Sequence, residues 1–136
     1  MGYTHYWKGQ VPAATDELLA VIDFIQTTVQ MQPLGIKLAD WSGSGSPKFD
    51  GTKIEFNGDQ DADGGDLSYE TFRADYGTAI GFGFCKTEHR PYDIAVVAIL
   101  SALDAYGPGF SWSSDGTDED TQAGRELARQ AIFSLR

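Results

Sequence analysis

The acidic stretch DQDADGGDLSYE, residues 59–70, has the residue types and spacing of a calcium-binding loop. Such a loop supplies carboxylate oxygens at alternating positions, a glycine for the sharp turn and a closing glutamate that binds with both oxygens. Asp59, Asp61 and Asp63 fall at the alternating positions, a glycine follows the third, and Glu70 closes the loop. The spacing therefore raises Ca²⁺ as a candidate ligand of these four carboxylates.

The residues on either side of this loop favour a different interpretation. An EF-hand lies between two helices, whereas residues 52–56 (TKIEF) and 68–72 (SYETF) are typical of strands. Aspartate and glycine are also the residues that a solvated hairpin loop prefers for turn formation. We therefore expect a hairpin loop and no resident cofactor, with Ca²⁺ binding as the alternative.

One cysteine and two histidines are the other residues with nucleophile or base chemistry: Cys85, His5 and His89. A catalytic cysteine needs a base within hydrogen-bonding reach. Cys85 falls in an expected strand, on a face otherwise made of alanine and glycine, which favours a buried structural thiol. His5 lies among the aromatic residues of the first strand, where it could act as a ligand or base or simply hydrogen-bond within the sheet.

Two polar segments precede expected helices. The segment CKTEHRPYD, residues 85–93, joins a strand to a helix start, where backbone N–H groups and the helix dipole favour an anion. The segment SSDG, residues 113–116, has the same arrangement before the last helix. If the two helix starts lie side by side, they form a small polar cleft. The candidate ligand-binding residues are His5, Lys86, Thr87, Arg90, Ser113, Ser114 and Asp115.

Composition and charge set limits on the class of protein. The chain has 136 residues, 41% of them hydrophobic, which suits a single domain over residues 1–136. A single cysteine excludes an internal disulfide and fits a reducing compartment, and no segment reaches the roughly 20 apolar residues of a membrane span. The net charge of −10 argues against nucleic-acid binding and suits a basic partner or a cation. We expect a cytoplasmic protein that does not bind a membrane.

Hydrophobic periodicity predicts helices at both ends of a β-rich middle region. Residues 3–7 form the first strand, and a helix follows Pro12 with Thr15 as its N-cap. A buried helix continues from Pro91, residues 110–114 form a strand, and Thr117 caps the last helix. The expected buried stripe of the first helix is Leu18, Ile22, Ile25 and Val29.

The middle region contains the remaining strands. Residues 36–41 form one strand, and the arms 48–49 and 52–56 flank a tight turn at Asp50–Gly51. Residues 67–73 and 78–86 form two more. The resulting order β-α-β-β-β-β-α-β-α, with hairpins in the middle, predicts an α+β fold with a mainly antiparallel sheet packed with three helices.

The strand over residues 78–86 has two different faces. One carries Ile80, Phe82 and Phe84, and the other carries only alanine, glycine and Cys85. A face lined with glycine lets a helix, another backbone or a ligand come close. Close packing of a helix is the interpretation that we favour.

Several motifs resemble those of a family of small proteins from bacteria and their phages. The chain opens with MGYTHYW, residues 1–7, and carries FNG before an ETF-containing strand, FCKT followed by PYD, and SSDG before the last helix. The resemblance spans nearly the whole chain. It implies a phage or prophage origin and assigns no activity. The related proteins join FNG to the next strand by a shorter link, which places the aspartates in a lengthened hairpin loop.

These observations predict a small acidic accessory protein without enzymatic activity, which binds a host protein or a small anionic, nucleotide-like ligand. The alternative is an enzyme that uses His5, Lys86, Arg90 and Asp115 on a phosphate- or nucleotide-containing substrate. The chain has no phosphate-binding GxxxxGK, no GxSxG, no CxxC and no HExxH motif, which lowers the case for a known class of enzyme. A surface that mimics DNA rests on net charge alone and ranks lower.

Overall fold

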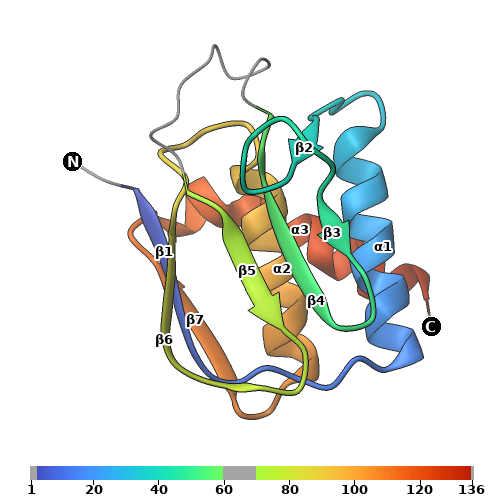
Figure 1. The fold of residues 1–136 in the computed structure, drawn as a ribbon, viewed down its shortest axis with the longest axis vertical. Coiled ribbons are helices and arrows are strands. Elements are labelled where there is room, and N and C mark those ends of the chain that lie inside the picture. The colour runs from blue at the N-terminus through green and yellow to red at the C-terminus, as the bar shows by residue number, and fades with distance from the viewer. Residues whose placement is uncertain (1–2, 60–69, 136) are drawn as a thin grey trace.

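The computed structural model describes residues 3–59 and 70–135 of the chain (Figure 1). The elements in chain order are β1 (Thr4–Gln10), α1 (Asp16–Gln30), β2 (Leu38–Ala39), β3 (Lys48–Phe49), β4 (Lys53–Gly58), β5 (Phe72–Asp75), β6 (Ala79–Lys86), α2 (Asp93–Tyr106), β7 (Phe110–Ser114) and α3 (Asp118–Ser134). The predicted α+β class and the order of its elements are confirmed, with the arms of the Asp50–Gly51 hairpin forming the separate strands β3 and β4.

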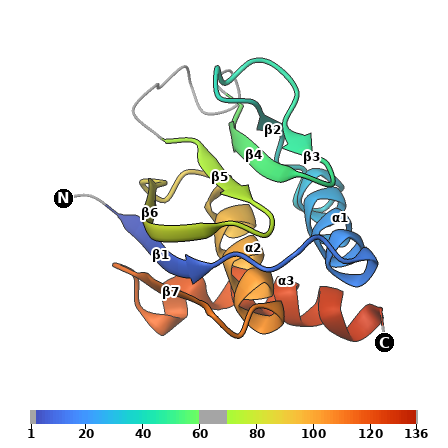
Figure 2. The ribbon, with the colours of Figure 1, turned by 60° about the horizontal axis from the view of Figure 1, so that its bottom comes forward.

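The strands form two antiparallel sheets. In the first, β1 lies between β6 and β7; in the second, β4 pairs with β2, β3 and β5. Figure 2 shows β5 and β6 as the facing edges of the two sheets, connected by a turn. No ladder joins these two strands within the described residues. The two sheets together therefore curve around the helices with a break between β5 and β6.

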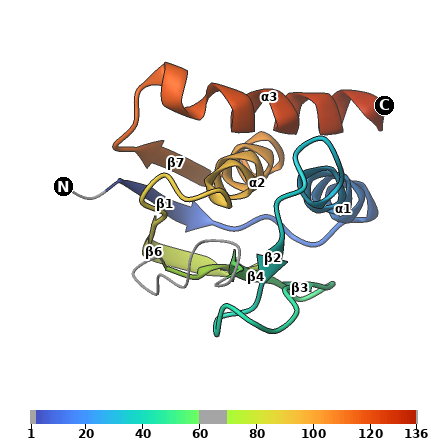
Figure 3. The same ribbon diagram turned by 90° about the horizontal axis from the view of Figure 1, so that it is seen from above.

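Helix α2 lies at the centre of the molecule. In Figure 3 it is surrounded by α1, α3 and the strands β1 and β7. Its run of apolar residues is buried on every side, from Ala95 through Leu100 and again at Ala102 and Leu103. A helical stretch that is apolar all round requires such a position, so the predicted burial of the apolar run is confirmed from Ala95 to Leu100, with Ile94 partly buried.

The outer helices begin at the predicted caps. Thr15 accepts a hydrogen bond from the Leu18 N–H, and Thr117 forms a capping box with Asp120. The first helix buries its predicted stripe against the core. The third helix approaches α2 closely at Gly124, where an added Cβ would lie 2.5 Å from the Val97 side chain. Only glycine permits this separation of the two helices.

The glycine-lined face of β6 does not pack against a helix, so that prediction is wrong. Trp7 pairs with Gly83 across the β1–β6 ladder, and an added Cβ on Gly83 would lie 2.4 Å from Trp7 Nε1. The indole therefore fills the space that the missing side chain leaves. Of the small residues of β6, Gly83 and Cys85 are buried, whereas Ala79 and Gly81 are exposed. Phe82 and Phe84 are directed outward, where they are 63% and 53% exposed.

Candidate functional site

The candidate site begins with a hydrogen-bonded group that joins β1 to the start of α2. His5 Nε2 lies 2.6 Å from Asp93 Oδ1, and the Thr87 hydroxyl donates to the same oxygen. His5 and Thr87 are fully buried. Because a carboxylate can only accept hydrogen bonds, the arrangement requires the His5 proton on Nε2. Two of the predicted site residues, His5 and Thr87, are thus brought together.

The second ring nitrogen of His5 has no partner within the described part of the chain. His5 Nδ1 is buried, and so is the hydroxyl of Tyr3, whose ring meets the imidazole edge-on with centroids 5.0 Å apart. Burial raises the pKa of Tyr3 to about 12, although the Ser114 hydroxyl acts in the opposite direction. An Asp–His pair resembles part of a catalytic triad, but here the imidazole is fully buried beside the rings of Tyr3 and Trp112.

The space between the two helix starts is filled by side chains. Tyr3 stacks on His89 with ring centroids 3.5 Å apart, and an added Cβ on Gly116 would lie 2.6 Å from the Tyr3 ring. The first turn of each helix also carries its own carboxylates, Asp93 in α2 and Asp118 to Asp120 in α3. A bound anion would compete with these carboxylates for the same backbone N–H groups.

The other predicted ligand-binding residues are dispersed around this group. Lys86 Nζ lies 3.1 Å from Glu88 Oε1, and Arg90 belongs to the turn that its N–H closes onto the Thr87 carbonyl. Ser113 pairs with Tyr6 across the β1–β7 ladder, so the two share the outer face. Ser114 accepts a hydrogen bond from the Gly116 N–H.

Asp115 continues the outer face beyond the end of β7. Its Oδ2 accepts hydrogen bonds from the Thr4 N–H and from the Tyr6 hydroxyl, each at 3.2 Å. The carboxylate therefore fixes the end of β1 and holds Tyr6 in place. It lies on the opposite side of the sheet from the buried His5.

Cys85 is a buried thiol, as the sequence indicated. Burial raises its pKa to about 12, which outweighs the lowering effect of the Tyr92 hydroxyl. Its Sγ lies 3.4 Å from the Glu70 carbonyl, to which Tyr92 also donates a hydrogen bond. A catalytic cysteine has a lowered pKa and a base beside it, and Cys85 has the opposite electrostatic environment.

The predicted calcium ligands are only partly within the described residues. Asp61 and Asp63 lie outside them. The buried Asp59 carboxylate lies 3.3 Å from Lys37 Nζ, and Glu70 Oε1 accepts a hydrogen bond of 2.7 Å from the Lys86 N–H. Residues 3–59 and 70–135 contain no group of three or more metal-ligating side chains. Calcium binding by this loop stays a prediction.

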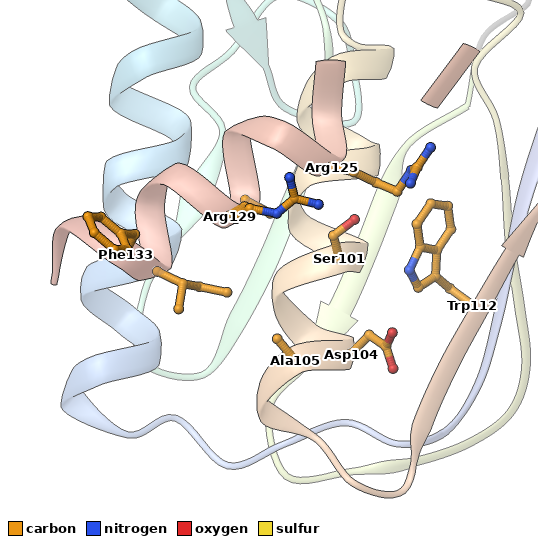
Figure 4. Close-up of a pocket in the computed structure, with 9 residues that line it drawn as sticks. Ser101, Asp104, Ala105, Trp112, Arg125, Arg129 and Phe133 are labelled. Atoms are coloured by element: carbon orange, nitrogen blue, oxygen red, sulfur yellow. The ribbon is translucent and has the colours of Figure 1, made fainter. Parts of the chain in front are cut away.

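A groove of about 380 Å³ lies between α2, α3 and β7 (Figure 4). Trp112 forms one wall, and Arg125 and Arg129 project from α3 on the other side. Both guanidinium groups already have partners: Arg125 Nη2 donates to the Asp118 carbonyl at 2.6 Å, and Arg129 Nη1 lies 2.8 Å from Glu126 Oε1. The groove combines an aromatic wall with positive charge that is largely compensated.

Three aromatic side chains cluster on the outer face of the β6–β1–β7 sheet. Phe82 lies between Tyr6 and Phe84, with ring centroids 5.9 Å away in both directions. We call Tyr6, Phe82 and Phe84 the aromatic face. A hollow of about 370 Å³ adjoins it, lined by Lys8 and by the serines Ser111 and Ser113. Large exposed aromatic side chains that gather in one place mark interaction surfaces.

Sequence reasoning missed two features of this region. It named His5 and Thr87 without their common partner, although an aspartate in the first turn of a helix that follows a CKT segment was a visible signal. It also expected a helix, and not the Trp7 indole, against the glycines of the 78–86 strand. The chain gave a hint in this case, because glycines opposite a tryptophan make room for an indole.

Comparisons of the chain with protein-family models, with curated proteins and with solved structures gave no match. None of the helices within residues 3–59 and 70–135 combines the length and the hydropathy that a membrane crossing needs.

Proposed function

We propose that this chain is a non-enzymatic binding protein that docks a partner protein with a basic surface onto its aromatic face. One observation carries the proposal: Phe82 and Phe84 are 63% and 53% exposed on an ordered strand rather than on a loop. Full burial of a phenylalanine is worth about 1.5–3 kcal/mol, so leaving these rings 63% and 53% exposed forgoes roughly half of that free energy for each. A partner that covers them recovers this free energy.

The negative net charge of the chain favours a partner with a basic surface. A net charge of −10 attracts basic surfaces over a distance and accelerates their association. Lysine and arginine also bind favourably over aromatic rings. A host protein with an arginine- or lysine-rich patch therefore fits both properties of the surface, in keeping with the accessory role that the phage resemblance suggested.

The buried groups favour binding over catalysis. His5 is fully buried beside the rings of Tyr3 and Trp112, and burial raises the pKa of the single thiol, Cys85, to about 12. The predicted basic residue Lys86 is paired with Glu88. The His5–Asp93 contact fixes β1 to the start of α2. An enzyme that used this pair would have to open this part of the fold.

Photo-crosslinking tests the proposal. A benzoylphenylalanine at position 84 is irradiated in a bacterial host lysate, the cross-linked protein is identified, and the purified partner is titrated against the chain. We expect Phe82→Ser with Phe84→Ser to weaken binding at least tenfold. Phe133→Ser removes a phenylalanine that is 79% exposed on α3 and serves as the matched control. Equal affinity for the wild type and the β6 double variant would refute the proposal.

A second candidate function rests on the groove of Figure 4. Trp112 offers a stacking surface for a base. Arg125 and Arg129 line the same groove, and their guanidinium groups keep N–H donors that Asp118 and Glu126 do not use and that suit a nucleotide-like anion. Titration with nucleoside monophosphates tests it by quenching of tryptophan fluorescence. Quenching that is lost in Trp112→Phe and in Arg129→Gln supports this function, whereas quenching unchanged by both variants contradicts it.

A further inference from the structure

The break between the two sheets forms a rift with strands on both sides. Its volume is about 480 Å³, and its walls are β5 and β6. The two strands are linked at one end, where the Glu70 N–H donates to the Lys86 carbonyl and Glu70 Oε1 accepts from the Lys86 N–H. At the other end the turn after Asp75 connects them (Figure 2). Between these points no described strand pairs with the facing edge of β6.

The edge of β6 that faces β5 presents backbone groups to the rift. In an antiparallel ladder, successive residues direct their N–H and C=O groups to opposite sides. The Thr87 N–H donates to the Tyr3 carbonyl of the β1 side, whereas the Lys86 groups turn to Glu70. The alternation then directs the N–H and C=O of Phe84 away from β1 and into the rift. Such an edge is a template for another strand.

The floor of the rift holds the indole N–H of Trp7, which lacks a partner among the described residues. Trp7 lines the rift, is 4% exposed, and its Nε1–H has no acceptor within the described part of the chain. A buried donor without an acceptor costs about 1–3 kcal/mol. A carbonyl oxygen of a chain lying in the rift would accept this hydrogen bond.

The net charge of the chain and the exposed rings of β6 favour a basic occupant of the rift. Arg73, the basic residue of β5, lies 3.5 Å from Glu55 and 3.4 Å from Asp75. Arg73 and Asp75 line the rift and their charges balance, whereas Glu55 belongs to β4 and does not line it. The negative charge that attracts a basic segment is the net charge of −10 of the whole chain. On the opposite wall the exposed rings of Phe82 and Phe84 suit the alkyl chain and cation of lysine or arginine.

We propose that the rift accepts an extended basic segment of the partner protein, which pairs with the β6 edge and completes the sheet between β5 and β6. Every second side chain of this segment is lysine or arginine and lies outward beside Phe82 and Phe84. The alternate side chains are small or apolar and lie over Trp7 and Val11. This mode of binding is strand addition to a sheet edge. The inference rests on the proposed function and specifies its partner.

Selection of displayed random dodecapeptides on the intact chain tests the inference. We expect the selected peptides to be basic, with alternating apolar residues. A synthetic peptide of a selected sequence is then compared with versions N-methylated at alternate residues. Only every second N–H of the peptide faces the β6 edge. Methylation of the residues in that set removes the hydrogen bonds between the strands and should weaken binding at least tenfold. The Phe84 amide should become protected from hydrogen exchange in the complex.

The outcomes separate the inference from the proposed function. Peptides that bind through Phe82 and Phe84 but tolerate methylation of both sets overturn strand addition and leave the proposed function standing. Peptides that are unaffected by the Phe82→Ser and Phe84→Ser double variant, or no enrichment at all, overturn both. Protection of the Phe84 amide that depends on protein concentration, with dimers in native mass spectrometry, identifies a second copy as the occupant and overturns the basic partner.

Discussion

His5 Nε2 lies 2.6 Å from Asp93 Oδ1, so one buried contact joins the first strand to the first turn of the central helix. The Thr87 hydroxyl donates to the same oxygen. Because the three residues come from β1, from the turn after β6 and from α2, this contact fixes the end of the first sheet to the core. Its main consequence is for stability.

We predict that Asp93→Ala destabilises the fold by about 2–4 kcal/mol, because His5 and Thr87 both lose their acceptor while buried. Asp93→Asn keeps an acceptor oxygen and should cost about 1 kcal/mol, the difference between a charged and a neutral hydrogen bond. Urea unfolding measures both. Asp104→Ala, which removes an exposed aspartate from the same helix, should stay within about 0.5 kcal/mol. Equal costs for Ala and Asn at position 93 would contradict the role of the acceptor.

The turn between β6 and α2 contains two residues in the left-handed region. Glu88 has φ 54° and His89 has φ 60°. This backbone costs about 1–2 kcal/mol for a residue with a side chain, and glycine avoids it at about 0.5–1 kcal/mol of chain entropy. Glu88→Gly also removes the ion pair with Lys86, which contributes about 0–1 kcal/mol at the surface. The variant should therefore be stabilised by at most about 1 kcal/mol in thermal or urea unfolding.

His89→Gly provides the contrast within the same turn. The substitution relieves similar backbone strain but removes the ring that stacks on Tyr3, a contact worth about 0.5–1.5 kcal/mol. We expect this variant to be less stable than Glu88→Gly by about 1 kcal/mol. If the histidine variant were the more stable of the two, the stack between Tyr3 and His89 would contribute nothing.

Local signals explain what the sequence predicted correctly. Thr15 and Thr117 are side-chain caps followed by acidic first turns, and the apolar run from Ile94 to Leu100 has no polar face. Each of these signals lies within a few residues of the structure that it specifies. The helices and the order of the elements can therefore be predicted from the chain without any knowledge of long-range contacts.

The features that sequence reasoning missed depend on residues far apart in the chain. Alternation separates the faces of β6, but the side that meets the core is decided by Trp7, which needs the space at Gly83. The polar cleft between the helix starts was predicted from their own residues, and Tyr3 of the N-terminal segment fills that space. The break between β5 and β6 likewise depends on which strands pair.

The buried thiol and phenols predict instability in alkali. Burial raises the pKa of Cys85 from 9.0 to about 12 and those of Tyr3 and Tyr76 from 10.0 to about 12. The folded state therefore holds these protons more tightly than the unfolded state. Their contribution to stability is complete below pH 9 and is lost as the pH rises toward 12.

A thiol reagent reports the same burial at lower pH. In the folded protein at pH 8, we expect dithionitrobenzoate to label Cys85 only through unfolding, so that the labelling rate rises steeply with urea. The unfolded chain in concentrated urea provides the reference rate. Rapid labelling of the native protein without denaturant would show that the thiol is accessible, contrary to its 0% exposure.

Asp50 predicts a matching loss of stability in acid. Its Oδ1 accepts hydrogen bonds from the Thr52 N–H at 2.8 Å, the Thr52 hydroxyl at 2.6 Å and the Lys53 N–H at 2.9 Å. These bonds, the Thr52 hydroxyl first, lower the pKa of Asp50 from 3.8 to about 2. The folded state thus favours the carboxylate, so the contribution is complete above pH 4 and is lost as the pH falls through about 2.

Two variants isolate this effect. Asp50→Asn does not titrate, so the stability difference between wild type and this variant should shrink between pH 5 and pH 2.5 in urea unfolding. Thr52→Val removes the hydroxyl donor at an exposed position, and NMR titration should then show the pKa of Asp50 moving up toward 3.8. A stability difference that stays constant over this pH range would mean that the turn does not discriminate between the charged and the neutral carboxyl.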